Sequence, residues 1–360
     1  MRILIDIGHP AHVHLFKNFA YEFEKKGNKV LFTTRTKEFE IELLNSYKLN
    51  YISFGKHHQS LLGKIWGLLK FDLQLLVTAI RFKPDIFLSH GSPYASHVAF
   101  ITRKPHISFE DTFNFEQIKL YRPFTSAILT ADYPHPSIGK HEIKYSGYHE
   151  LSYLHPNVFK PSETVLLALK LKPGEKFVIL RFISWSATHD RGHNGFSLLN
   201  KLRIVEEFSK YAKVFISSEK PLPPRLEEFK IPIAPSQMHD AIAFSSLMFG
   251  ESATMVSEAA VLGVPGIYLD NTGRYYTKDQ EEKYGLVFNY TESEKDQIKA
   301  LEKGVEILSG KESSKSWQKR RANLIGDKID VTAFLVWFVE NYPQSIITMK
   351  ENPDHQRNFI

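Results

Sequence analysis

The sequence predicts an α/β protein of two doubly wound domains, each a parallel, Rossmann-like sheet with helices on both faces. Short β-branched and aromatic runs alternate with helical patterns along the chain, which is typical of parallel βαβ units. This alternation pauses near Asn157 and restarts at Phe177. With 360 residues, 42% of them hydrophobic, the chain is long enough to bury two cores.

Residues 1–157 are expected to form the first domain. Its opening strand has an apolar pattern, and the helix after it ends at Gly27, a suitable C-cap. The expected strands are 1–7, 29–34, 85–89, 106–108 and 127–130, and the expected helices are 13–26 and 37–47.

The aromatic segment 145–160, followed by Pro161, is expected to connect the two domains, with the boundary after Asn157. Residues 158–342 then form the second domain. An amphipathic helix within 329–342 closes it, and 343–360 is a mostly polar tail that we expect to be frayed. The expected strands of this domain are 177–182, 212–217, 247–250 and 266–269, and its earlier helices are 198–211 and 254–262.

Composition excludes several kinds of chemistry. The chain has no cysteine, so disulfides, thiolate catalysis and Cys-ligated metal centres are excluded. The N-terminus enters a strand directly, and no uncharged run is long enough to span a bilayer, so we expect a cytoplasmic protein. A net charge of +6 suits nucleotides, phosphates or an anionic membrane surface. Because the basic residues are scattered, no nucleic-acid partner is expected.

The strongest motif is residues 249–269, FGESATMVSEAAVLGVPGIYL. A strand ends at Gly250, and a helix begins near Thr254. This arrangement brings Ser252, Thr254 and free backbone N–H groups to a helix N-terminus, where an anion can bind. Glu258, one turn further on, could turn towards a ribose diol. The alternative is an ordinary βαβ turn in which the hydroxyls only cap the helix.

A histidine-rich loop, His9, His12 and His14, follows the first strand, at the edge where parallel sheets bind ligands. His12 could be a general base oriented by Glu110 or Asp111, or a hydrogen-bond donor while one of those carboxylates is the base. The cluster could also bind a metal, or serve only in capping and packing. We expect no metal, because the carboxylates would have to come from distant segments.

In the second domain, the loop after strand 177–182 is cationic. Arg181, Ser184 and His189 could clamp a diphosphate, for which arginine provides paired hydrogen bonds. A solvated basic loop is the alternative.

The 249–269 block resembles the donor-nucleotide motif of GT-B glycosyltransferases, especially the N-acetylglucosaminyltransferase of peptidoglycan synthesis, and of UDP-sugar 2-epimerases. The resemblance implies that Ser252, Ala253 and Thr254 cradle a diphosphate and that Glu258 binds the ribose. His12–Val13 matches the histidine–valine pair after a glycine-rich loop, although Pro10 and Ala11 stand where that loop has glycines.

The resemblance extends over about residues 1–290. PDIFLSHGSP, ISFEDT and SGYHE resemble further blocks of the peptidoglycan enzyme, and Glu110 falls on its strand-end glutamate. The whole chain is similar to the DUF354 family, which implies a GT-B fold with an N-terminal acceptor domain and a C-terminal donor domain facing a central cleft. The residues expected on the acceptor side of that cleft are His9, His14, His90, Ser92, His149 and Glu150.

These features together predict metal-independent, inverting transfer of a sugar from a nucleotide-diphosphate sugar, a UDP-sugar in particular, to a glycan or lipid-linked acceptor. No other cofactor is expected. A non-hydrolysing UDP-sugar 2-epimerase and a non-catalytic nucleotide-sugar-binding protein are the alternatives.

The segment 61–83 is strongly apolar with interspersed lysines and arginines. Such a helix can lie in a membrane interface, which would place the protein peripherally at the inner face of the membrane. Core helices are more common than interfacial ones, so we expect it to pack on its own sheet.

Overall fold

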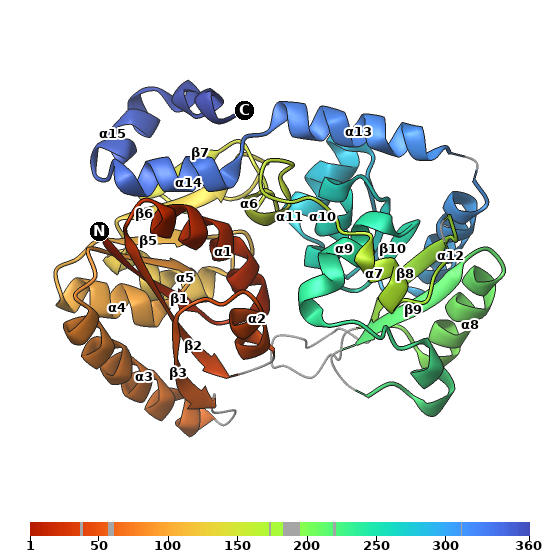
Figure 1. The fold of residues 1–360 in the computed structure, drawn as a ribbon, viewed down its shortest axis with the longest axis horizontal. Helices are drawn as coiled ribbons and strands as arrows, with labels where there is room; N and C mark the ends of the chain where they lie inside the picture. Colours follow the sequence, from red (N-terminus) through yellow and green to blue (C-terminus); the bar gives the residue numbers. More distant parts are fainter. Residues whose placement is uncertain (37–38, 57–60, 173, 183–194, 219–220, 311) are drawn as a thin grey trace. The chain divides into compact units, whose positions relative to one another are not determined.

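The chain folds into two compact units, described here from a computed structural model (Figure 1). The first unit comprises Met1–Val158 and Lys328–Ile360, and the second comprises Phe159–Asp327. The structure describes residues 1–36, 39–56, 61–172, 174–182, 195–218, 221–310 and 312–360. Within these ranges, no helix has both the length and the apolarity needed to cross a membrane.

The first unit is built on a seven-stranded, fully parallel sheet with the order β3-β2-β1-β4-β5-β6-β7. The inner strand RILIDI is buried after its first residue, as a mostly apolar strand in a parallel sheet should be. The strands are β1 (Arg2–Ile7), β2 (Lys29–Thr36), β3 (Tyr51–Lys56), β4 (Ile86–His90), β5 (His106–Phe109), β6 (Ala127–Ala131) and β7 (Glu142–Tyr145).

Helices cover both faces of this sheet. Because βαβ crossovers are right-handed and the strand order reverses after β3, α1 and α2 lie on one face and α3, α4 and α5 on the other. The helical segments are α1 (Pro10–Lys25), α2 (Glu40–Ser46), α3 (Leu61–Phe82), α4 (Pro93–Ile101), α5 (Phe115–Tyr121), η1 (Arg122–Phe124), α6 (Leu151–Leu154), α14 (Val331–Glu340), α15 (Gln344–Glu351) and η6 (Pro353–Phe359).

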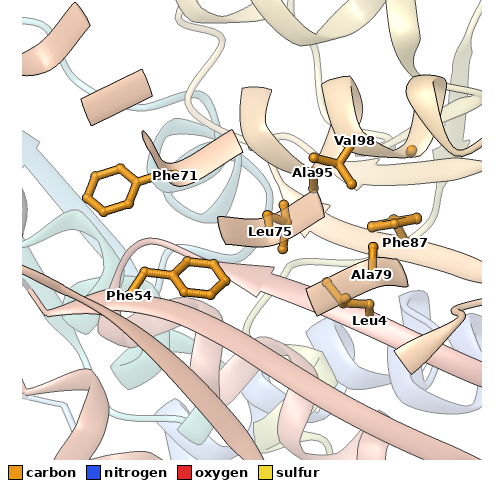
Figure 2. Packing of buried hydrophobic residues seen from close by; sticks show 9 residues of the cluster. Leu4, Phe54, Phe71, Leu75, Ala79, Phe87, Ala95 and Val98 are labelled. Atoms are coloured by element: carbon orange, nitrogen blue, oxygen red, sulfur yellow. The ribbon is translucent and has the colours of Figure 1, made fainter. Parts of the chain in front are cut away.

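Part of the core lies between the sheet and α3 and α4 (Figure 2). Leu4 and Phe87, from neighbouring strands, belong to one buried cluster with Leu75 and Ala79 of α3 and Val98 of α4. Helix α3 therefore does pack on its own sheet, as expected, but it does so with one side only.

The second unit has a five-stranded parallel sheet with the order β12-β11-β10-β8-β9. Its strands are β8 (Phe177–Phe182), β9 (Lys213–Ser218), β10 (Leu247–Gly250), β11 (Gly266–Leu269) and β12 (Val287–Tyr290). Its helical segments are α7 (Thr164–Ala168), α8 (Leu198–Ser209), η3 (Pro224–Phe229), η4 (Pro235–Gln237), α9 (Met238–Phe244), α10 (Ala253–Leu262), α11 (Tyr275–Asp279), the π-helical turn η5 (Gln280–Tyr284), α12 (Glu294–Leu308) and α13 (Ser314–Asp327).

The end of the chain differs from expectation. Residues 328–342 were assigned to the second domain, but they belong to the first unit, where α14 packs on α1 and α6. The reason is aromatic packing, since the Phe334 ring stacks on Tyr145 of β7 with 5.9 Å between centroids. Sequence proximity to the second domain carried no information about this contact.

The expectation of a frayed tail at 343–360 is also wrong. The segment forms α15 and η6, and Phe359 packs its ring on Phe334 and Trp337. Two hydrogen bonds fix it: Asp330 N–H donates to the Phe359 carbonyl at 2.7 Å, and Ser146 N–H donates to Gln356 Oε1 at 2.6 Å. A few well-spaced apolar side chains are thus enough to dock a mostly polar segment.

Candidate functional site

The loop after β1 presents the predicted histidines in different roles. His9 is the N-cap of α1, and its Nδ1 accepts from Ala11 N–H at 3.1 Å. His12, in the first turn of α1, accepts from Gly8 N–H through Nδ1 at 3.3 Å. A neutral His12 ring must therefore carry its own proton on Nε2, which makes Nε2 a hydrogen-bond donor.

Three further side chains meet at the carboxyl edge of the same sheet. The Asp111 carboxylate, after β5, lies 3.0 Å from His90 Nε2 at the end of β4 and 3.2 Å from His149 Nδ1, after β7. We call His90, Asp111 and His149 the imidazole–carboxylate cluster. The ring of His12 stacks on His90 with 4.6 Å between centroids, so it borders the cluster.

Aromatic rings also pack around His149. It stacks on Tyr145 and meets Phe109 and His90 edge to face. Its second nitrogen, Nε2, is buried and has no hydrogen-bond partner among the described residues. A buried imidazole nitrogen without a partner is uncommon and indicates a ligand, a water or a reacting group.

The cluster has strongly perturbed acidities. Burial alone would raise the pKa of Asp111, but the charges and hydrogen bonds of His149 and His90 hold that pKa well below its usual range. Burial would lower the pKa of His90, yet Asp111 outweighs it and raises that pKa. For His12, burial and the neighbouring His90 and His9 all act to lower the pKa, so the ring is neutral at pH 7.

The cluster could also hold a metal ion, because one ligand atom from each of its three residues lies within 4.8 Å of the others. Two imidazoles and a carboxylate are suitable ligands for zinc. The hydrogen bonds to Asp111 account for the same geometry without an ion.

Glu110, the other predicted carboxylate, is not part of the cluster. Its Oε1 accepts from the N–H and hydroxyl of Thr112 and from Phe113 N–H, and its Oε2 accepts from the Tyr121 hydroxyl at 2.6 Å. Both oxygens are therefore occupied inside the turn after β5. This geometry leaves Asp111 as the carboxylate able to orient a base.

The remaining residues expected on the acceptor side are buried in structural contacts. Ser92 caps α4 through Ala95 N–H and donates to Asp6, which pairs with Arg35 at 2.8 Å. His14 packs against Tyr47 and Tyr153, and Glu150 is buried at the start of α6.

In the second unit, the β10–α10 junction has the predicted form. Gly250 has φ +150°, and a Cβ there would lie 2.1 Å from the Arg181 carbonyl oxygen, so only glycine fits. Ser252 is the N-cap, and its hydroxyl accepts from Met255 N–H at 3.4 Å. Ala253 and Thr254 form the first turn, where backbone N–H groups have no partner within the helix.

Glu258, the residue expected to bind the ribose, contacts a histidine of the same unit. It is buried, and its Oε1 lies 3.0 Å from His239 Nε2 inside the second unit. Arg181 donates to the Ser217 hydroxyl on the neighbouring strand at 3.0 Å. Ser184 and His189 lie outside the described residues.

One turn at the carboxyl edge of the second unit's sheet is not among the sequence-based predictions. After β11, Asp270 Oδ1 accepts from the N–H and hydroxyl of Thr272 and from Gly273 N–H. Burial would raise its pKa, but the hydrogen bonds from Thr272 and the charge of Arg274 lower it. Glu110 and Thr112 form the same arrangement in the first unit. The sequence that indicates this turn is DNTG, which directly follows the expected strand 266–269.

The family model for DUF354, described as a protein of unknown function, matches residues 1–295, so the chain belongs to this family. An uncharacterized protein of Methanocaldococcus jannaschii is 24% identical over 283 residues, which is 74% of this chain and 80% of that protein.

Solved structures are similar over nearly the whole chain. The UDP-GlcNAc 2-epimerase of Neisseria meningitidis bound to UDP-GlcNAc matches with a TM-score of 0.65 and 16% identity, covering 95% of this chain and 100% of that one. The glycosyltransferase SsfS6 of Streptomyces sp. SF2575 matches with a TM-score of 0.60 and 13% identity, over 95% and 100%. The predicted fold class, two parallel-sheet α/β domains of the GT-B type, is thereby confirmed.

Proposed function

We propose that this protein is a glycosyltransferase that moves a sugar from a nucleotide-diphosphate sugar, a UDP-sugar in particular, to a glycan or lipid-linked acceptor. Its fold is shared with a glycosyltransferase and with an epimerase that binds UDP-GlcNAc. The observation that carries the choice of reaction is the imidazole–carboxylate cluster of the first unit.

The donor would bind the second unit at the start of α10. The first-turn amides of Ala253 and Thr254, together with the helix dipole, favour a diphosphate. The Ser252 hydroxyl serves as the cap, so backbone groups supply the recognition there. These fixed dipoles would stabilise the leaving diphosphate without requiring a bound cation.

The acceptor hydroxyl would be deprotonated on the first unit. With Asp111 accepting the Nδ1 proton of His149, the lone pair of His149 is on Nε2, the nitrogen without a partner. The acceptor oxygen attacks the anomeric carbon, its proton passes to His149 Nε2, and the bond to the diphosphate oxygen breaks with inversion. His12 Nε2–H, which is a donor, would hydrogen-bond the sugar or a phosphate oxygen.

A 2-epimerase is less well supported, because that reaction needs paired acid and base carboxylates around C2. Asp6 is held by Arg35 and Ser92, and Glu110 by its own turn. Asp111, by contrast, is directed at the imidazoles of His90 and His149.

Two measurements test the proposal. Thermal denaturation with UDP, other nucleoside diphosphates and their sugars identifies the donor, which should raise the melting temperature. NMR of the protein with the stabilising nucleotide sugar alone should show no isomer, and adding glycan or lipid-linked acceptors should release free nucleotide diphosphate. An isomer formed without acceptor would identify an epimerase, and no stabilising nucleotide would refute both reactions.

A further inference from the structure

Helix α3 has an apolar stripe on the side that faces away from the sheet. Leu69, Leu73, Val77 and Ile80 are separated by three or four positions, so they share one face of the helix. Leu69 and Leu73 are each 62% exposed and Ile80 is 61% exposed. The opposite face, with Phe71, Leu75 and Ala79, is buried against the sheet (Figure 2). Helix α3 is therefore apolar on two sides. A helix that only covers a sheet needs one apolar side, the one that faces the sheet.

Exposed apolar side chains continue onto the neighbouring helices. Helix α4, which contacts α3 (Figure 1), ends in Phe100 and Ile101, exposed by 63% and 59%. Helix α5, next to α4, adds Leu120, which is 54% exposed. Each of the three helices connects two parallel strands and lies on the same face of the sheet. Their C-terminal ends therefore lie at the same edge of the sheet, where the strands begin. We call this surface of α3, α4 and α5 the docking face.

The charges around the docking face have one predominant sign. Within residues 69–122, six cationic side chains are exposed, whereas Glu116 is the one exposed carboxylate; Asp72 is half-buried and lies 3.1 Å from His97. The cations lie at or near the C-terminal ends of α3, α4 and α5: Arg81, Lys83, Arg103, Lys104, Lys119 and Arg122.

We propose that the docking face binds the surface of an anionic phospholipid bilayer. Leucine, isoleucine and phenylalanine side chains on exposed helices can enter the boundary between headgroups and acyl chains, and flanking lysines and arginines can extend to lipid phosphates. Each cation near such a surface strengthens the binding. The charge complementarity with anionic lipid favours this occupant, and the inference does not depend on which reaction the protein catalyses.

Vesicle flotation tests the proposal with the full chain. Wild-type protein should float with vesicles of phosphatidylglycerol and phosphatidylcholine in equal parts and remain behind with phosphatidylcholine alone. Binding should weaken as salt is raised, because surface charges are screened. The double variant Leu73→Ser/Ile80→Ser should bind at least about tenfold more weakly, and Arg103→Glu/Lys104→Glu should lose most of the preference for anionic lipid.

The second unit offers a matched control. Leu167 and Leu199 are 78% and 75% exposed, so Leu167→Ser/Leu199→Ser makes the same kind of change outside the docking face and should bind like wild type. Thermal denaturation of each variant verifies the fold. No flotation of wild type, or equal flotation of the Leu73→Ser/Ile80→Ser variant, would overturn the proposal. Concentration-dependent self-association that this variant abolishes would do the same, because it would identify a second copy as the occupant.

Discussion

Nδ1 of His149 lies 3.2 Å from Oδ2 of Asp111, although the two residues follow different strands of the sheet. The carboxylate fixes the orientation of the ring, and the opposite nitrogen is buried without a partner among the described residues. An imidazole whose proton is fixed on one nitrogen by a carboxylate is a suitable general base near neutral pH. A substitution at Asp111 should therefore affect catalysis and ligand binding differently.

Replacing Asp111 with Asn should lower kcat about 10²- to 10⁴-fold, because the His149 ring loses the group that orients it. The affinity for the nucleotide should stay unchanged, since the proposed diphosphate site is on the second unit. Initial rates and calorimetric titration with UDP measure the two effects. His97→Asn is the control, because His97 pairs with Asp72 outside the cluster. Equal turnover by Asp111→Asn and wild type would rule out this role.

Glu258→Ala should destabilise the second unit. The carboxylate is buried against His239, so its removal leaves a buried imidazole without this partner. We expect a loss of roughly 3 kcal/mol in the free energy of unfolding. Urea denaturation of Glu258→Ala, His239→Ala and the double variant gives the coupling energy. Unchanged stability with lost UDP binding would contradict this structural role and support ribose binding by Glu258.

Gly250→Ala should prevent stable folding of the second unit or cost about 3 kcal/mol or more, since the new Cβ would lie 2.1 Å from the Arg181 carbonyl oxygen. Circular dichroism during denaturation measures the loss. Gly326→Ala is matched to it, because the added Cβ would meet nothing within 4 Å beyond its chain neighbours and its own helix backbone, and it should be neutral or slightly stabilising. Comparable stability of the two variants would show that the β8–β10 contact is not tight.

Acidification should destabilise the first unit through His106. Burial lowers the pKa of this residue to about 3, and its ring is hydrogen-bonded by Ser89 and Thr125 at 2.8 Å each. Because the unfolded chain takes up the proton first, stability falls as pH drops below the unfolded value. Between about pH 7.5 and pH 5 this single residue should cost about 2 kcal/mol.

The test is urea denaturation of wild type and His106→Gln at both pH values. The variant starts less stable, but it should lose about 2 kcal/mol less than wild type on acidification, because it has no proton to take up. His12 contributes to the acid loss in both proteins and cancels in the difference. Parallel losses in the two proteins would contradict the assignment.

Deleting residues 343–360 should lower the melting temperature by several degrees, since the deletion uncovers Phe334 and Trp337 and removes the acceptor of Ser146 N–H. Differential scanning calorimetry provides the measurement. Deleting Ile360 alone, a residue that is 63% exposed, is the control and should change nothing. A truncated protein as stable as wild type would indicate that the tail contacts contribute no net stability.

The fold was predictable where apolar runs are long. The strands 177–182, 247–250 and 266–269 were predicted with the bounds that β8, β10 and β11 have. By contrast, β3, β7 and β12 were missed. All three lie at the edges of their sheets and carry mixed polar sequences, so their position depends on a neighbouring strand rather than on their own pattern.

The site was only partly predictable, because residue type does not reveal the direction of a side chain. Glu110 and Asp111 are adjacent and chemically similar, yet the first accepts bonds within its own turn and the second joins His90 and His149. The distinction depends on Thr112, Phe113 and Tyr121, which supply donors to Glu110 alone. The spacing of residues in the sequence does not indicate which of two adjacent carboxylates receives these hydrogen bonds.

The second unit is one continuous stretch of chain, whereas the first is assembled from two stretches separated by it. During synthesis on the ribosome, the strands of the seven-stranded sheet therefore emerge first. Helix α14, which packs on this unit, is made only after residues 159–327. Until then, the surface of Tyr145 that Phe334 later covers has no partner from this helix. We expect that a chain stalled before Lys328 would expose this surface and depend on chaperones. The second unit of the same chain would already be complete and able to fold.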